Sequence, residues 1–113
     1  MDGKALAREY YRSIDDDEYD ALAGVLSEGF VHRRPDTTIG SRDAFVTFMR
    51  EERPERDTTH VVESVYLDEN GDAAVEGRLL DPNGEEWFRF VDTFDIGDDG
   101  IECVRTYTSS GFE

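Results

Sequence analysis

The sequence predicts one α+β domain, and two patterns along the chain predict it. In the first half, apolar residues recur every three or four positions, which is typical of amphipathic helices. From Thr58 onward they alternate with polar residues, and the turn-forming runs DENGD, DPNG and GDDG separate four such segments. Helices followed by an antiparallel meander define the α+β class. At 113 residues the chain fits a single domain, residues 1–113.

Three helices are expected before the meander, at residues 5–14, 18–26 and 42–51. In the first helix, Leu6, Tyr10 and Ile14 fall on one face. The acidic run DDD at 15–17 is expected to be solvated, to end this helix and to cap the second one. Ser41 is the expected N-cap of the third helix.

The strands follow in order. FVHRR at 30–34 predicts a short strand that Pro35 ends, and residues 38–40 form a brief extended piece. The four long strands are THVVESVYL, AAVEGRLL, EWFRFVDTFDI and IECVRTYT. An amphipathic sheet of this length needs a cover for its apolar face, and the N-terminal helices are the available cover.

The charge of the chain restricts its partners. Acidic residues number 28 against 12 basic ones, and the net charge is −16. Such a surface repels duplex nucleic acid and anionic membranes, so neither is expected as a partner. Acid-rich, lysine-poor surfaces resemble those of cytoplasmic proteins from salt-accumulating halophiles, where salt screens the repulsion. We therefore expect a halophilic, cytoplasmic protein, with an acidic mesophilic protein as the alternative.

Several kinds of segment and site are not expected. The chain has no apolar run long enough for a membrane span, and its N-terminus lacks the pattern of a signal peptide. The single cysteine, Cys103, lies in the segment IECVR and is expected to be a small buried hydrophobe. His32 and His60 lack metal-ligand spacing, so no metal is expected. No P-loop, GxGxxG or GxSxG motif occurs, and no cofactor is expected.

Four segments together resemble one family over nearly the whole chain. They are EYYRSIDDDEYDALAGVLSEGFVHRRP at 9–35, IGSRDAFVTFM, VDTFDI and IECVRTY. Their order and spacing resemble the NTF2-like superfamily, in its ketosteroid isomerase and SnoaL-like polyketide cyclase branch. The resemblance implies a cone in which three N-terminal helices pack on a curved antiparallel sheet around a small-molecule pocket.

The resemblance also implies roles for three residues. Tyr10 falls where ketosteroid isomerases keep the tyrosine of the oxyanion hole, and Asp92 falls where they keep a protonated aspartic acid. The isomerase's catalytic carboxylate is expected just before the proline, where this chain has Arg34. A guanidinium cannot act as a base near neutral pH. The isomerase reaction therefore does not transfer through that residue.

Asp92 stands on an otherwise apolar strand face, shared with Phe88, Phe90, Phe94 and Ile96. A buried, unpaired carboxylate is costly, so it must be protonated or paired. One alternative is a structural ion pair with Arg34. The others are a group that binds ligand and a true proton donor with a raised pKa.

His32 shares a strand face with Arg34, and it is the expected substitute for the missing base because histidine titrates near neutral pH. The alternative is a hydrogen-bonded histidine at the rim. Of the neighbouring Tyr10 and Tyr11, the helical stripe selects Tyr10 to point inward. The predicted catalytic residues are therefore Asp92, Tyr10 and His32, and the predicted ligand-binding residues are Arg34, Phe90, Phe48 and Trp87. Phe30, Phe45, Phe88 and Phe94 are further candidates for the wall and core.

The outer sheet face is expected to carry cross-strand ion pairs and to form a homodimer. Its expected charged residues are Arg78, Arg89, Glu63, Glu76 and Glu102. His60 is expected at the surface or the dimer face, and strand phase leaves the facing of Tyr107 and Arg105 open.

Two functions remain open. The first is an enzyme that isomerises, cyclises, dehydrates or hydrolyses a small, largely apolar compound by acid–base chemistry. It requires an open cavity of ~300 Å³ or more that reaches Asp92. The second is a non-catalytic binding or scaffold domain acting through dimerisation.

Overall fold

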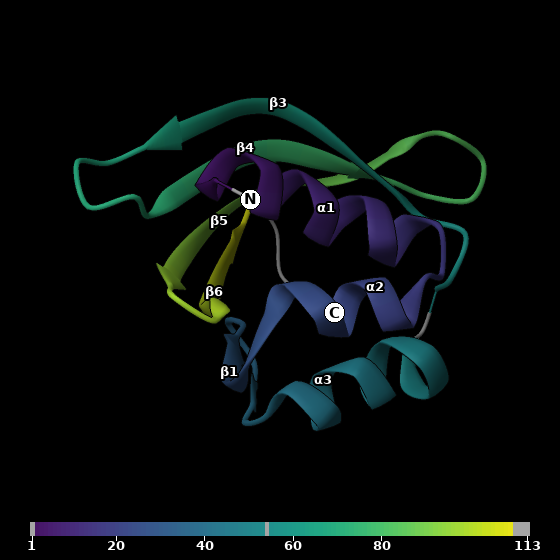
Figure 1. The fold of residues 1–113 in the computed structure, drawn as a ribbon. Coiled ribbons are helices and arrows are strands. Elements are labelled where there is room, and N and C mark those ends of the chain that lie inside the picture. The colour runs from purple at the N-terminus through teal and green to yellow at the C-terminus, as the bar shows by residue number, and fades with distance from the viewer. Residues whose placement is uncertain (1, 54, 110–113) are drawn as a thin grey trace.

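The computed structural model describes residues 2–53 and 55–109, and it confirms an α+β fold (Figure 1). The helical elements are α1 (Gly3–Asp15), α2 (Tyr19–Val25), α3 (Arg42–Thr47) and the π-helical turn Phe48–Glu52. The strands are β1 (Leu26–Arg33), β2 (Thr38–Ile39), β3 (Thr59–Leu67), β4 (Ala73–Leu80), β5 (Glu86–Gly97) and β6 (Gly100–Thr108). In Figure 1 β3 and β4 curve over α1, and α2 and α3 lie below it.

The six strands form one sheet in the order β2-β1-β6-β5-β4-β3. The meander from β3 to β6 is antiparallel, as predicted. The pairing of β1 with β6 is parallel, so the sheet is mixed rather than wholly antiparallel. This pairing joins segments about seventy positions apart, and a short strand carries no sequence signal for the direction of so distant a partner.

Element boundaries differ most near the second and third helices. β1 begins at Leu26, directly after α2, so the strand is longer than predicted. The third helix begins as predicted, because Ser41 Oγ accepts a hydrogen bond from the backbone of Ala44 at 3.0 Å. It then widens into the π-helical turn Phe48–Glu52. The long strands lie within one residue of the predicted segments because alternation and turn residues mark both of their ends.

The acidic run at 15–17 does not cap α2. The N-cap residue of α2 is Glu18, which makes no side-chain capping bond. Instead, Asp15 binds His60, Asp16 binds Arg12, and Asp17, at φ 57°, accepts from Tyr19. The prediction that this run caps α2 was wrong, because each carboxylate makes a different side-chain contact, whereas Asp16 and Asp17 are exposed to solvent as predicted.

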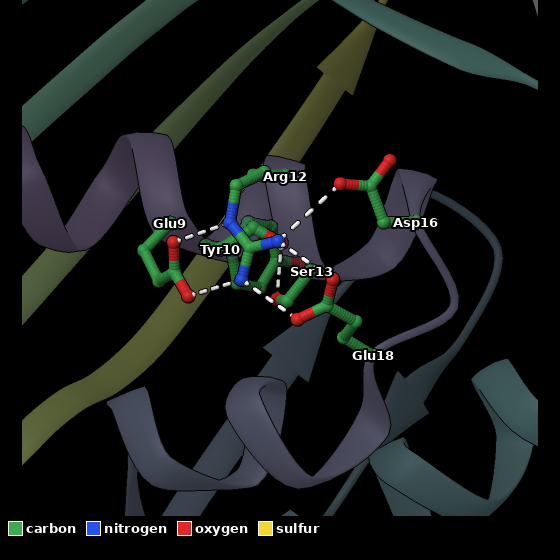
Figure 2. Close-up of polar contacts among 6 residues, drawn as sticks. All are labelled: Glu9, Tyr10, Arg12, Ser13, Asp16 and Glu18. Atoms are coloured by element: carbon green, nitrogen blue, oxygen red, sulfur yellow. Dashed lines mark hydrogen bonds and ion pairs between the residues drawn. The ribbon is translucent and has the colours of Figure 1, made fainter.

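Arg12 ties the α1–α2 corner together on its exposed side (Figure 2). Its guanidinium binds Glu9 at 2.6 and 2.7 Å and Glu18 at 3.0 and 3.2 Å, with Asp16 at 3.3 Å. These hydrogen bonds raise the pKa of Arg12 above its usual value. On the buried side of the same turn, Ser13 Oγ donates to the carbonyl of Tyr10 at 3.0 Å. The corner thus fixes the helix that carries the two buried tyrosines.

The core lies between the helices and the inner sheet face, as the amphipathic strands predicted. Phe30, Phe45 and Phe94 are fully buried there, and Cys103 is buried as predicted. In β4 the inner face is Ala73, Val75, Gly77 and Leu79. A Cβ at Gly77 would lie 2.4 Å from the carbonyl oxygen of Val61 and 2.9 Å from the Phe90 ring. Glycine is therefore required at position 77, where the ring of Phe90 packs against the backbone of β4.

The outer face carries part of the predicted ion-pair pattern. Glu63 pairs with Arg78 at 3.4 Å and also with Arg89. Glu76 instead accepts a hydrogen bond from the hydroxyl of Tyr66 at 3.2 Å. Cross-strand register places Tyr107 opposite Val91, and both are exposed. This settles the facing of Tyr107, which is outward.

Candidate functional site

A cavity of about 150 Å³ opens between the helices and the inner face of the sheet. It is lined by all seven residues predicted for the site: Tyr10, His32, Arg34, Phe48, Trp87, Phe90 and Asp92. Asp92 and His32 are 5% and 4% exposed, whereas Trp87 is 47% exposed, so the first two mark its closed end and Trp87 its open side. The cavity is smaller than the ~300 Å³ expected for an enzyme of this kind. It suits a ligand smaller than a drug-sized molecule.

Asp92 is held by two hydroxyl groups. Tyr11 donates a hydrogen bond to its Oδ2 at 2.5 Å, and Thr106 donates to its Oδ1 at 2.5 Å. These are the short distances of O–H···O⁻ hydrogen bonds. Arg34 makes an ion pair with Asp36, at 3.8 Å. Asp92 is therefore stabilised by neutral donors rather than by the Arg34 pair that the sequence offered as one alternative.

The same network fixes the tautomer of His32. Nε2 of His32 lies 3.0 Å from Thr106 Oγ1. While Asp92 is ionised, the single hydroxyl hydrogen of Thr106 is directed at Asp92, so the oxygen of Thr106 accepts from His32 and Nε2 carries the proton. Nδ1 is then unprotonated. It is buried and has no hydrogen-bond partner among the described residues. The network runs His32–Thr106–Asp92–Tyr11.

Burial shifts the pKa values of Asp92 and His32, two members of this network, in opposite directions. It raises the pKa of Asp92, and the hydrogen bonds from Thr106 and Tyr11 offset only part of that increase. Burial, with a smaller effect from the positive charge of Arg34, lowers the pKa of His32 to about 3. His32 is therefore neutral near pH 7, and Asp92 holds a proton more readily than an exposed aspartate.

Both tyrosines of α1 are buried, so the prediction that only Tyr10 points inward was wrong. Tyr10 and Tyr11 are 3% and 2% exposed, and their rings meet edge to face with centroids 5.2 Å apart. Tyr10 lines the cavity and stacks on Phe45, while Tyr11 supplies the hydroxyl that binds Asp92. Burial raises the pKa of both phenols well above the usual value, so both are neutral donors.

Arg34 and Phe48 form part of the wall together. The guanidinium carbon of Arg34 lies 5.0 Å from the ring centroid of Phe48, a cation–π contact. The Arg34 side chain is 18% exposed. A positive charge therefore stands on the cavity wall beside an aromatic ring.

His60 lies at the cavity rather than at the surface, which corrects the prediction. Its Nδ1 is 2.6 Å from Asp15 Oδ1, and its backbone N–H donates to Asp15 Oδ2 at 2.9 Å. Its ring packs near Tyr11 and Phe90. These hydrogen bonds hold the first residues of β3 against the end of α1, and this contact forms one wall of the cavity.

Sequence reasoning missed four residues that build the site: Tyr11, Thr106, Arg53 and His60. Strand phase contained the signal for Thr106, because in β6 it alternates with the outward-facing Tyr107 and Arg105 and pairs across from Asp92. The single apolar stripe of the first helix predicted that Tyr11 points outward. In the structure α1 packs between the sheet and the other helices, so it has two buried faces. Arg53 directly follows the π-helical turn, and no sequence pattern predicted that turn.

Among residues 2–53 and 55–109, no helix combines the length and hydropathy needed to span a bilayer. In the same residues, no group of three or more histidine, cysteine, aspartate or glutamate side chains is arranged to hold a metal ion.

Known structures share this architecture. A candidate ketosteroid isomerase from Kribbella flavida aligns with a TM-score of 0.81 at 24% identity, over 96% of this chain and 78% of that one. A candidate SnoaL-like polyketide cyclase from Jannaschia sp. aligns with a TM-score of 0.76 at 16% identity, over 95% and 85%. An NTF2-like protein of unknown function from Cytophaga hutchinsonii aligns with a TM-score of 0.81 at 15% identity, over 96% and 91%. At these identities the likeness shows the fold, which is NTF2-like.

The family follows from the sequence itself. No curated protein matches the chain. The family model for the SnoaL-like domain matches residues 7–104, which include most of α1, all elements from α2 to β5, and the first five residues of β6. The chain belongs to the SnoaL-like domain family.

Proposed function

We propose that the protein binds a small, largely apolar ligand in this cavity and transfers a proton on it, as an isomerase, cyclase or dehydratase. One observation carries the proposal: a buried carboxylate with a raised pKa stands at the closed end of a cavity that also holds a neutral histidine. Titratable groups with pKa values displaced by burial cluster at functional sites. The apolar lining and small volume limit the ligand to a compact molecule.

His32, Thr106 and Asp92 form the proposed proton relay. His32 is a weak base alone, because it keeps a proton only below about pH 3. As Nδ1 accepts a proton from the ligand, Nε2 passes its own to Thr106 Oγ1, and the hydroxyl hydrogen of Thr106 moves to Asp92 Oδ1. The proton thus comes to rest on Asp92, whose pKa burial raises. Tyr10 stabilises the oxyanion charge that develops on the ligand, and Arg34 holds a polar group of the ligand.

The test needs no known substrate. Small ketones such as cyclohexanone exchange their α-hydrogens for deuterium in D₂O, and proton NMR follows the rate. We expect the protein to accelerate the exchange, and Asp92→Asn and His32→Ala to abolish the acceleration without unfolding the chain. Asp95→Asn is the matched control, because Asp95 lies on the same strand and is paired with Arg105 at 3.0 Å. Acceleration that survives both site substitutions would refute these roles.

A second candidate function is a non-catalytic scaffold that acts as a homodimer. The observation that favours it is a set of large hydrophobic side chains that the described chain leaves exposed: Tyr66, Leu67, Trp87, Val91 and Tyr107. Val91 and Tyr107 are opposite each other on the outer sheet face. A dimer by light scattering that Val91→Glu converts to a monomer would support this interface. Absence of any ketone exchange in the same preparation would favour the scaffold over the enzyme.

The acidic composition supports a proposed setting for either function. A net charge of −16 suits a cytoplasm rich in salt, where screening weakens the self-repulsion of the folded chain.

A further inference from the structure

Arg53 is a buried cation on the cavity wall that the proposed proton relay does not use. It caps the C-terminal end of the π-helical turn and lines the cavity. Its side chain is only 8% exposed. Buried guanidinium groups ordinarily have partners for their N–H donors, because an unsatisfied charged donor is costly.

Only one nitrogen of this guanidinium is satisfied by the described residues. Nη2 donates to Asp17 Oδ1 at 2.9 Å and to the carbonyl of Arg56 at 3.3 Å. Nε and Nη1 are buried and have no hydrogen-bond partner within residues 2–53 and 55–109. The contacts to Asp17 and Arg56 therefore orient the guanidinium and leave N–H donors for another acceptor.

The other charges on the cavity wall favour an anion as that acceptor. Arg34 adds a second guanidinium to the same lining. The carboxylates of the lining are Asp92, at the closed end, and Glu55, which is exposed. The chain has a net charge of −16, so most of its surface repels anions. The two arginines on this small cavity give its wall a local positive charge instead.

We infer that the ligand of this cavity is a small carboxylic acid, whose carboxylate binds the free N–H groups of Arg53 while its apolar body lies against Phe48, Phe90 and Leu79. The inference rests on the proposed function, because it names the class of ligand that enters the same cavity. Guanidinium matches carboxylate geometry, and charge-assisted hydrogen bonds are the stronger kind. The apolar lining selects the body of the molecule, and the volume of about 150 Å³ limits its size.

Matched pairs of acid and neutral amide test the inference: benzoate with benzamide, and cyclohexanecarboxylate with its carboxamide. Binding is measured by titration of amide chemical shifts, and shifts at Phe90 and Thr106 report occupation of the cavity. We expect the acids to bind about ten- to a hundredfold more tightly than the amides, the range that hydrogen bonds to a charged group confer.

Arg53→Gln should remove that preference. Arg50→Gln is the matched control, because it makes the same charge change three residues away on an exposed side chain and should keep the preference. Arg53→Lys, which keeps the charge near Asp17 without the planar fork, should keep part of it and remains informative if Arg53→Gln does not fold.

The outcomes separate this inference from the proposed function. Equal binding of acids and amides within the cavity would overturn the carboxylate site and leave the apolar pocket standing. An acid preference that persists in Arg53→Gln would overturn the assignment to Arg53. Binding of neither member of any pair at millimolar concentration would overturn both proposals.

Discussion

The two faces of β5 hold carboxylates by opposite means. On the inner side Asp92 is 5% exposed and is bound by the hydroxyls of Tyr11 and Thr106. On the outer side Glu63 of β3 reaches over to Arg89 of β5 and Arg78 of β4. Burial raises the pKa of Asp92 although two hydroxyls donate to it, whereas Glu63 is paired with two arginines at the surface. The difference separates the buried face that lines the cavity from the exposed face that carries ion pairs.

The largest expected effect lies on the inner face and depends on pH. His32 has a folded-state pKa of about 3 against 6.5 unfolded, so the unfolded chain binds the extra proton between these values. Stability from this group is present above pH 6.5 and is lost as pH falls toward 3. Lowering the pH from 7 to 4 should cost the wild type about 3 kcal/mol more than His32→Gln. Urea denaturation at both pH values measures it, and equal losses would show that His32 is not buried as a neutral ring.

Asp92 should act in the opposite direction. Its pKa is raised from 3.8, so the folded chain binds the extra proton and gains stability below the raised pKa. As pH rises from 3.8 through the folded-state pKa, that contribution is lost. Asp92→Asn should therefore gain stability relative to the wild type over this window. The same urea series checks the sign, and a relative loss for Asp92→Asn with rising pH would contradict it.

Glycine in β4 offers the next largest effect. Gly77→Ala should destabilise the fold by about 1–3 kcal/mol, because the new Cβ would press on the Val61 carbonyl and the Phe90 ring. Since Phe90 lines the cavity, ligand binding should weaken as well. Gly29→Ala is the control, because a Cβ there meets nothing within 4 Å. Thermal melts of the two variants that coincide would show that the inner face tolerates the extra methyl group.

Removing one hydroxyl compares the two faces directly. Thr106→Val takes a donor from Asp92 and an acceptor from His32, and should cost about 1–3 kcal/mol. Thr93→Val, on the outer side of β5, should cost less. Guanidinium denaturation of both variants measures the difference. Equal costs would mean that the network adds nothing to stability.

The smallest effect is expected on the outer face. Glu63→Gln should change stability by less than about 1 kcal/mol, because Glu63 and its two arginines are all about a third or more exposed. Raising KCl from 0.1 to 1 M should instead raise the melting temperature, since screening acts on the whole net charge of −16. Calorimetry measures both. A melting temperature that falls with added KCl would contradict the halophilic proposal.

Much of the fold followed from the sequence because periodicity and turn residues are local signals. β3 and β4 match the predicted segments, since DENGD and DPNG fix where these strands end. The seven predicted site residues all line one cavity, and their roles stay predictions. The partners of Asp92 and the position of His60 could not be read, because a hydrogen bond across 81 residues depends on the side-chain geometry of the finished core.

The place of β6 between β1 and β5 has a consequence for biosynthesis. β6 follows β1 and β5 along the chain but lies between them in the sheet, so on the ribosome β1 and β5 each lack a neighbour until β6 emerges. Until then Asp92 has no Thr106 beside it and the inner aromatic residues have no complete cover. Pairings between such distant segments slow folding, and the open edges invite association with other chains. The pairing of β6 with both β1 and β5 thus decides whether the cavity forms at all.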